Sequence, residues 1–199
     1  MILLVILLGS TIFGYSGTNQ YDYKILYFNT FFHPDLLPNI KSDSLSVNLK
    51  GFMFTPYYGS IDRSAGSIHT LESPLQSGAS IIRGNSKLTI KAQNTGEHPL
   101  EIVSFNFDYH RAWAMSPSEL KVIVKHEEEI LENTISKFLT YGSMLERVSD
   151  FKDVNLSFEE IIVLKPGEEL IFQLTAHRFR DGALGYLDNV AIVGRDIDQ

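Results

Sequence analysis

The residues best suited to ligand recognition lie along the stretch 103–113, which reads VSFNFDYHRAW. Successive residues of a strand point to opposite faces, so Ser104, Asn106, Asp108 and His110 share one face and the apolar residues share the other. The single tryptophan, Trp113, follows directly. Polar side chains hydrogen-bond sugar hydroxyls, and an aromatic ring stacks on the apolar side of a sugar. We therefore predict a carbohydrate site that includes Trp113, His110 and Asp108 on an exposed strand face.

A second polar stretch, HRFRDG at 177–182, adds Arg178 to this predicted site, because guanidinium groups bind carboxylated sugars. Each of these residues also has a plainer interpretation. Trp113 would cover one end of the domain, and Arg178 would belong to an ordinary polar strand end. Asp108 and His110 would form a solvated strand face, or would pair for acid–base chemistry.

The stretch GYLDNVAIVG at 185–194 reads as a strand, but two polar residues, Asp188 and Asn189, lie side by side in it. Their neighbours on either side are apolar, so regular alternation would direct one of the two polar side chains into the core. A buried carboxylate is costly unless it is hydrogen-bonded or bound to a cation. We expect Asp188 or Asn189 to bond the backbone of a neighbouring loop, with a bound cation as the alternative.

Composition and charge exclude several classes of function. The chain has 199 residues, 44% of them hydrophobic, which is a globular composition of one-domain size. It has no cysteine, so disulfides, thiolate nucleophiles and cysteine-ligated metals are excluded. A net charge of −7, with no run of Lys or Arg, argues against a nucleic-acid partner. The six histidines lack zinc spacing, and no nucleophile elbow or phosphate-binding loop is present, so we predict no catalysis.

The elements that position these residues are short strands. Alternation of apolar and polar residues recurs at 45–50, 87–94, 103–110, 119–126 and 170–177, and Pro166–Gly167 has the residues of a type II turn. Seven to nine such strands with turn signals between them predict an all-β fold, an antiparallel β-sandwich. The alternation does not reveal the order of the strands.

The stretch 127–148 departs from this pattern. Leu131, Ile135, Phe138 and Leu139 have helical spacing, acidic residues begin the stretch and Gly142 follows. We predict one short inserted helix or ordered loop around residues 127–145.

The N-terminus reads MILLVILLGSTIFGYSG, an apolar run too short for a spanning helix and followed by small residues. We predict a signal peptide over residues 1–16, with cleavage after Ser16, and a single domain over 17–199. The predicted location is secreted, extracellular or periplasmic. An uncleaved membrane anchor and a buried first strand are the alternatives.

The stretches at 103–109, 166–174 and 187–194 together have a known pattern: φxφxFxφ, then a Pro-Gly turn with φxFxφ, then φDNφxφxG, where φ is apolar. The chain thereby resembles the jelly-roll modules of secreted bacterial surface proteins of the PEP-CTERM (exosortase-sorted) group. It is also similar to jelly-roll carbohydrate-binding modules. The resemblance spans about 43–194 and implies a jelly roll. The Pro-Glu-Pro motif, apolar helix and basic tail of that group do not follow, so we expect either a released protein or a truncated gene product rather than surface sorting.

The resemblance also implies a cation. In similar carbohydrate-binding jelly rolls an aspartate near the C-terminus helps to hold a structural calcium ion, and Asp188 with Asp181 would supply ligands here. No other cofactor is expected. The predicted function is a secreted, non-catalytic module that binds an extracellular carbohydrate or matrix polymer. A structural or adhesive protein without a small ligand, and a polysaccharide-acting enzyme, are the alternatives.

Overall fold

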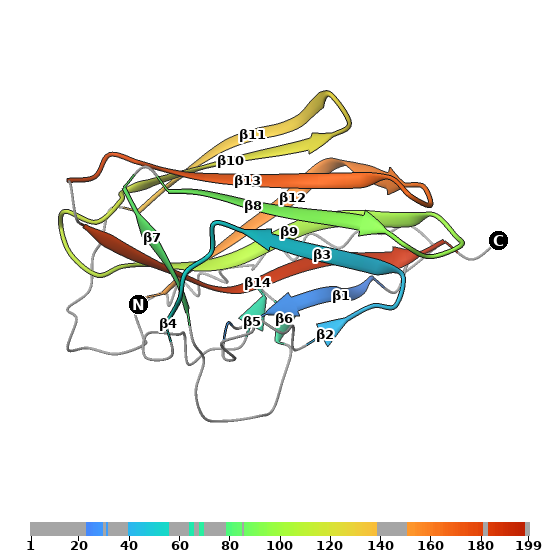
Figure 1. Ribbon diagram of the computed structural model, residues 1–199, viewed down its shortest axis with the longest axis horizontal. Coiled ribbons are helices and arrows are strands. Elements are labelled where there is room, and N and C mark those ends of the chain that lie inside the picture. Colours follow the sequence, from blue (N-terminus) through green and yellow to red (C-terminus); the bar gives the residue numbers. More distant parts are fainter. Residues whose placement is uncertain are drawn as a thin grey trace, which may run out of the picture.

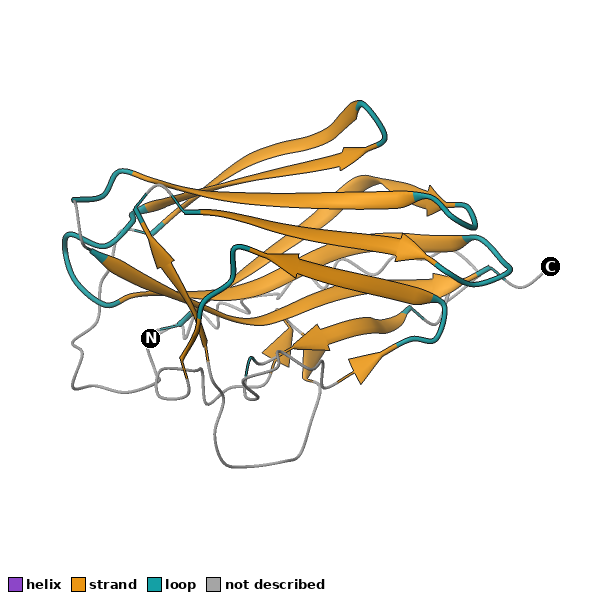
Figure 2. Cartoon of the chain, in the orientation of Figure 1, coloured by secondary structure: helices purple, strands orange, loops and turns teal. Residues whose placement is uncertain are grey.

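The computed structural model describes residues 23–29, 31, 40–55, 64–65, 68–69, 79–84, 86–138, 151–180 and 183–197. Every regular element in these residues is a strand (Figure 2). The strands form two large antiparallel sheets and a small two-stranded one (Figure 1). The prediction of an all-β sandwich is therefore confirmed. No helix in the described part of the chain is long and apolar enough to cross a membrane. The predicted signal peptide lies outside the described residues.

The first sheet, sheet A, has the order β12-β9-β14-β1-β2, and β7 pairs with both β14 and β4. Its strands are β1 (Lys24–Asn29), β2 (Ile40–Lys41), β4 (Phe54–Thr55), β7 (Ala79–Arg83), β9 (Leu100–Arg111), β12 (Lys152–Leu164) and β14 (Leu184–Asp196).

The second sheet, sheet B, has the order β11-β10-β13-β8-β3. Its strands are β3 (Leu45–Lys50), β8 (Lys87–Asn94), β10 (Glu119–His126), β11 (Glu129–Lys137) and β13 (Glu169–His177). The small pair consists of β5 (Ser64–Ala65) and β6 (Ile68–His69).

The strand order is that of a jelly roll. From β7 onwards the chain visits sheet A, sheet B, sheet A, then sheet B twice, and then A, B and A. Because the chain crosses repeatedly between the two sheets, β9 lies between β12 and β14 in sheet A, and β13 lies between β10 and β8 in sheet B. This connectivity confirms the jelly-roll prediction, which the alternation of residues alone could not supply.

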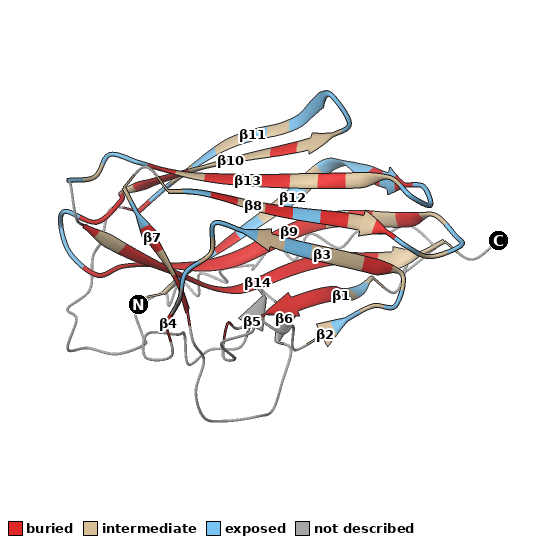
Figure 3. Cartoon of the chain, in the orientation of Figure 1, coloured by how far each residue is buried: buried red, intermediate tan, exposed pale blue. Residues whose placement is uncertain are grey.

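The core fills the space between the two sheets. Phe105 of β9 stacks on Phe172 of β13 across that space, with ring centroids 4.4 Å apart. The buried residues of β8, β10 and β13 alternate with more accessible ones, as Figure 3 shows along each strand. Burial of these apolar side chains is the main favourable contribution to folding.

The prediction of a helix within 127–145 is wrong over the described part, because Glu129–Lys137 forms the edge strand β11. It pairs with β10 from Glu119↔Lys137 to His126↔Glu129, with one register shift near Leu131. Leu131 and Ile135 are four residues apart, a spacing that puts two residues on one face of a helix and also on one face of a strand. Ile135 and its β-branched neighbour Thr134 suit a strand equally well. Residues 139–150 lie outside the described part.

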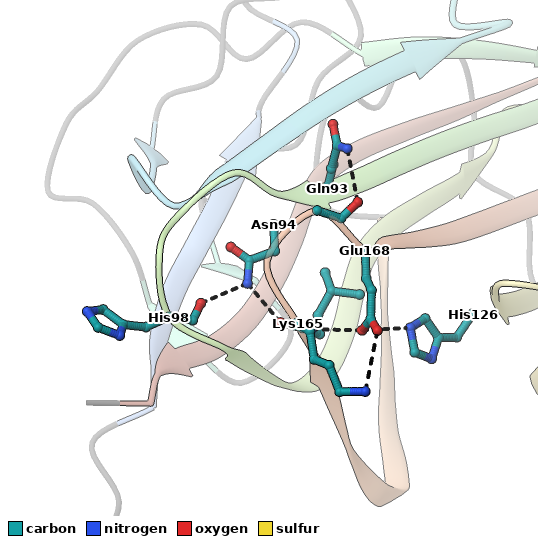
Figure 4. A network of polar contacts seen from close by, with 8 residues as sticks. Gln93, Asn94, His98, His126, Lys165 and Glu168 are labelled. Atoms are coloured by element: carbon teal, nitrogen blue, oxygen red, sulfur yellow. Dashed lines mark hydrogen bonds and ion pairs between the residues drawn. The ribbon is translucent and has the colours of Figure 1, made fainter. Parts of the chain in front are cut away.

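The Pro166–Gly167 turn is confirmed and joins a network of polar contacts at one end of the sandwich (Figure 4). Gly167 has φ of +86°, which a type II turn requires at its third position, and the Glu168 N–H donates to the Lys165 carbonyl at 3.0 Å. The Glu168 carboxylate accepts from the Lys165 N–H at 2.8 Å and lies 3.3 Å from His126 Nε2. These contacts fix the turn between β12 and β13 against the end of β10.

Candidate binding surface

The outer face of sheet B carries many of the charged and polar side chains that are accessible to solvent. Residues that lie opposite one another in antiparallel strands share a face, so the register assigns each side chain. The inward residues of β8, β10 and β13 are the buried apolar ones. The outward residues include six lysines, drawn from four strands: Lys50, Lys87, Lys91, Lys121, Lys125 and Lys137.

Four of these lysines form a rectangle, which we call the lysine rectangle: Lys87, Lys91, Lys121 and Lys125. Lys91 of β8 and Lys125 of β10 both lie opposite Ile171 of the intervening strand β13. In the same way Lys87 and Lys121 both lie opposite Thr175. From strand spacing and rise, the rectangle measures about 10 Å across the strands and about 13 Å along them.

The interior of the lysine rectangle contains both polar and apolar side chains. Gln173 lies at its centre, with Thr89 on one side and Ile123 on the other. Lys50 of β3 extends this row because it lies opposite Thr89. Amide and hydroxyl groups between cations can hydrogen-bond a polymer whose charges the lysines hold.

The face has an excess of positive charge although the whole chain carries −7. Its acidic residues are Glu119 and Glu169, so the six lysines leave four positive charges in excess. Both glutamates contact cations: Glu169 lies 3.1 Å from Lys91, and Glu119 lies 3.2 Å from Arg178. Within the described part of the chain, Lys91 is the only one of the six lysines in an ion pair. Lys50, Lys87 and Lys137 are exposed, and Lys121 and Lys125 are partly exposed.

Asp108 and His110 do not lie on a solvated face, so the expectation that this strand face is exposed is wrong. Asp108 is 0% exposed and His110 is 7% exposed. Both point away from sheet B, but β5 lies against β9 and β14. The His110 ring also stacks on Phe151, with centroids 5.3 Å apart. Alternation correctly separated the two faces of this strand, but it could not show that the outer face is covered as well.

A bulge in β14 corrects the expectation that Asp188 or Asn189 points into the core. The pairing with β9 shifts between Asp188 and Ala191, so β14 carries one extra residue there. Asn189 has φ of +48°, in the left-handed region that asparagine tolerates better than most residues. Its Nδ2 donates to Asp108 Oδ2 at 2.6 Å, and its N–H donates to Asp188 Oδ1 at 2.7 Å. Both polar residues can therefore lie on the outer side, while Leu187 and Val190 belong to the core.

Trp113 and Arg178 lie at one end of the sandwich, in neighbouring loops. The Ser118 N–H donates to the Arg178 carbonyl at 3.3 Å, and the Arg180 N–H donates to the Met115 carbonyl at 3.1 Å. Trp113 is 36% exposed, and Met115 beside it is also exposed. The structure therefore brings Trp113 and Arg178 to the same end and places Asp108 and His110 beneath the sheet surface.

The predicted calcium site remains a prediction. Asp188 is fully buried, and its Oδ1 accepts the Asn189 N–H. Asp181, its expected companion, lies outside the described residues. Among the residues that the structure describes, no three acidic or histidine side chains cluster closely enough to hold a metal ion.

A groove separates β11 at the edge of sheet B from β12 at the edge of sheet A. One part, of about 380 Å³, lies between 129–132 of β11 and 158–163 of β12. Another, of about 620 Å³, lies between 134–138 and 152–156. The first part holds four glutamates: Glu129, Glu132, Glu159 and Glu160. Its acidic lining makes it unsuitable for an anionic ligand.

Sequence reasoning missed the lysine rectangle because its lysines do not form a run. The available signal was a pair of lysines four residues apart in each of two predicted strands, KLTIK and KVIVK. Four is an even number, so each pair shares a face. That the two pairs lie two strands apart, with β13 between them, follows only from the jelly-roll order.

Comparison with known proteins adds little to this description. No family model and no curated protein sequence matches the chain. Among solved structures, the CBM22-1 xylan-binding domain of Paenibacillus barcinonensis Xyn10C is 13% identical, covering 88% of this chain and 96% of its own, with a TM-score of 0.42. The K3 adhesin domain of Lys-gingipain from Porphyromonas gingivalis is 9% identical, with coverages of 86% and 98% and a TM-score of 0.41. TmCBM61, solved with β-1,4-galactotriose, is 12% identical, with coverages of 75% and 88% and a TM-score of 0.37. At these values the fold assignment rests on the strand order of the chain itself.

Proposed function

We propose that this protein is a secreted, non-catalytic module that binds an anionic extracellular polysaccharide on the outer face of sheet B. The observation that carries the proposal is the lysine rectangle, in which Lys87, Lys91, Lys121 and Lys125 surround Gln173. The separation of the lysines is comparable with the length of a disaccharide. A polymer with one carboxylate or sulfate per disaccharide would meet successive cations as it crossed the sheet.

The physical basis of the binding is charge attraction with hydrogen bonds between the charges. Exposed lysines keep their hydration and their freedom, so each contact contributes little, about 0.2–1 kcal/mol. Several contacts to one chain add up, and salt at physiological strength screens them over about 8 Å. We expect affinities in the micromolar range or weaker, with a steep dependence on ionic strength.

A polysaccharide fits this face better than single-stranded nucleic acid does. Proteins that bind single strands combine cations with aromatic rings on which bases stack. The outward residues of β3, β8, β10, β11 and β13 include no phenylalanine, tyrosine or tryptophan. Their threonine, glutamine and asparagine side chains instead match the hydroxyl groups of sugars.

The placement of the carboxyl groups on the face supports binding without catalysis. Glycoside hydrolysis requires two carboxyl groups that flank one bond, one of which gives up a proton. Glu119 lies opposite His177, at the other end of β13 from Glu169, so the two glutamates of this face are about 27 Å apart and cannot flank one bond.

The Trp113 end of the sandwich is a second candidate, for a neutral sugar. The specific observation is the 36% exposure of Trp113 beside Met115, with Arg178 and Arg180 in the neighbouring loop. A half-exposed indole ring next to guanidinium groups can stack on one sugar and hydrogen-bond another.

The test is titration calorimetry with polygalacturonate and, in parallel, a neutral glucan of similar length. The variant Lys91→Gln/Lys125→Gln removes one short side of the rectangle and should lower affinity for polygalacturonate about tenfold, which corresponds to about 1.4 kcal/mol. The control, Lys152→Gln/Lys165→Gln, removes two exposed lysines elsewhere and should change affinity less than twofold.

The outcomes separate the candidates. Equal affinity of the rectangle variant and the control variant would refute the sheet B site. Loss of binding to the neutral glucan in Trp113→Ala would instead favour the loop end. No binding of either polymer by the wild-type protein would support the structural or adhesive alternative.

A further inference from the structure

The outward residues of sheet B are ordered in rows that run across the strands. Strands β11, β10, β13 and β8 are neighbours in that order, and their pairing places one residue of each strand in a row (Figure 1). Two of these rows contain the lysine rectangle, and we name each row by its residue in β13. The 171 row consists of Ile130, Lys125, Ile171 and Lys91, and the 175 row consists of Ile135, Lys121, Thr175 and Lys87.

Uncharged and positively charged residues alternate along both rows. Each row has an isoleucine in β11, a lysine in β10, an uncharged residue in β13 and a second lysine in β8. Neighbouring strands are about 4.8 Å apart, so the two lysines of a row are about 10 Å apart with an uncharged residue halfway between them. The row that separates the two contains no charged residue and consists of Asn133, Ile123, Gln173 and Thr89.

This alternation selects among anionic polymers. The advance of one sugar along an extended polysaccharide is close to one strand spacing, so a chain that crosses the strands meets one residue of a row with each sugar. A polymer with a carboxylate on every sugar would place every second carboxylate over Ile171 or Thr175, where no cation lies beneath it. At Ile171 the carboxylate would also lose water to an aliphatic surface, which is unfavourable. A polymer in which acidic and neutral sugars alternate avoids both penalties.

The uncharged residues indicate what the neutral sugar presents to the protein. Three of the four are isoleucine. Ile130 and Ile135 are 53% and 51% exposed, and Ile171 is partly exposed between the two lysines of its row. Contact of these side chains with a methyl group or with the C–H groups of a sugar ring removes apolar surface from water, which is favourable. An N-acetyl group on the neutral sugar would supply such a methyl group.

We infer that the ligand is a polysaccharide in which an acidic sugar alternates with a neutral, N-acetylated sugar, and that it crosses the strands along the 171 row or the 175 row. This inference rests on the proposed function and specifies its ligand. A path along the strands matches such a polymer less well, because the two lysines of one strand are about 13 Å apart. A single outward residue, Thr89 in β8 or Ile123 in β10, separates them there.

The test is titration calorimetry of the full chain with two polymers of the same number of sugars. One is hyaluronan, in which glucuronate and N-acetylglucosamine alternate, and the other is polygalacturonate. Polygalacturonate has twice as many carboxylates per length, so charge attraction alone would make it the tighter ligand. We expect hyaluronan to bind the wild-type protein more tightly instead, by about threefold.

Two substitutions change the alternation without removing a lysine. Ile171→Lys and Thr175→Lys each add a cation at the middle of a row, so that three lysines follow one another about 5 Å apart. Each variant should increase the affinity for polygalacturonate about threefold more than the affinity for hyaluronan. The control, Asn133→Lys, adds the same charge to the same face in the row between and should change both affinities by the same factor. Circular dichroism and melting temperature will show that each variant is folded.

The outcomes distinguish this inference from the proposed function. Tighter binding of polygalacturonate by the wild-type protein would overturn the inference and leave the sheet B site in place. Equal changes in Asn133→Lys and in the two row variants would do the same. Binding of neither polymer, or binding that Lys91→Gln/Lys125→Gln leaves unchanged, would refute the proposed site itself and the inference with it.

Discussion

Replacement of Asn94 by alanine should destabilise the protein more than any other single polar change at the turns of Figure 4. The Asn94 side chain is 0% exposed. Its Nδ2 donates to the carbonyl groups of Leu164 and His98, each at 2.8 Å, and its Oδ1 accepts the Gly96 N–H at 2.9 Å. One amide group thus joins the end of β12 to the turn that follows β8.

The size of the effect follows from the burial of the groups left behind. The bond to Leu164 is fully buried, and a buried polar group without a hydrogen bond costs about 1–3 kcal/mol. The bonds to His98 and Gly96 are partly buried, so water would replace them at a net cost of about 0.5–1 kcal/mol each. The sum is about 3 kcal/mol, which lowers the melting temperature by about 6–12 °C in a domain of this size.

The assay is thermal unfolding by circular dichroism, with Gln93→Ala as the matched control. Gln93 is the preceding residue and makes one exposed bond, to the Gly167 carbonyl at 3.1 Å. Its removal should cost no more than about 0.5 kcal/mol. Similar losses of melting temperature in the two variants would show that burial does not control the value of these bonds. That result would refute the reasoning.

The variant Asn94→Asp gives an independent check with a pH signature. It keeps the acceptor for Gly96 but sets a carboxylate against two carbonyl oxygens. Burial and these oxygens both raise the pKa of the new carboxyl group. The variant should therefore be least stable at neutral pH and should recover part of its stability as the pH falls. A variant as stable as the wild-type protein at pH 7 would contradict this account.

Three further outcomes are expected. The Lys165 N–H and the nearby cations lower the pKa of Glu168, so the stability that Glu168 contributes is present above the ordinary glutamate pKa and is lost as the pH falls through the lowered value. Glu168→Gln should therefore reduce the loss of stability at acid pH in unfolding experiments. An unchanged dependence of stability on pH would contradict this role of Glu168. Asn189→Ala should be about 1–2 kcal/mol less stable than Asn189→Gly because of the positive φ at this position, although both variants lose the bond to Asp108. Equal melting temperatures of the two variants would argue against backbone strain at the bulge. If Asp188 helps to hold calcium, a chelator in excess should lower the melting temperature, and an unchanged value would remove that prediction.

Much of the architecture could be predicted from local patterns. Alternation along 103–110 correctly directed Phe105 and Phe107 to the core, because a strand offers its side chains only two directions. The Pro166–Gly167 turn was equally predictable, since few residues adopt the positive φ that it requires. The stretch 129–137 was mistaken for a helix because the four-residue spacing of Leu131 and Ile135 fits one face of a helix and one face of a strand equally well.

The predicted site residues differ in the same way in how far the sequence could place them. The sequence correctly identified Trp113 and Arg178 as residues outside the apolar pattern, and the structure places both at the surface of one end. The sequence could not show that Asp108 is buried, because alternation indicates which face of a strand a side chain takes but not whether that face is covered.

By itself, then, the sequence determined the β-class, the two faces of each strand and the turn at Gly167, since all of these depend on residues a few positions apart. The tertiary structure alone decided the bulge that places Asp188 and Asn189 on one side, and the burial of Asp108 beneath that surface. It also decided the lysine rectangle, whose corners Lys91 and Lys125 meet only across β13. These features depend on which strands become neighbours, and strand pairing in a jelly roll joins residues that are far apart in the chain.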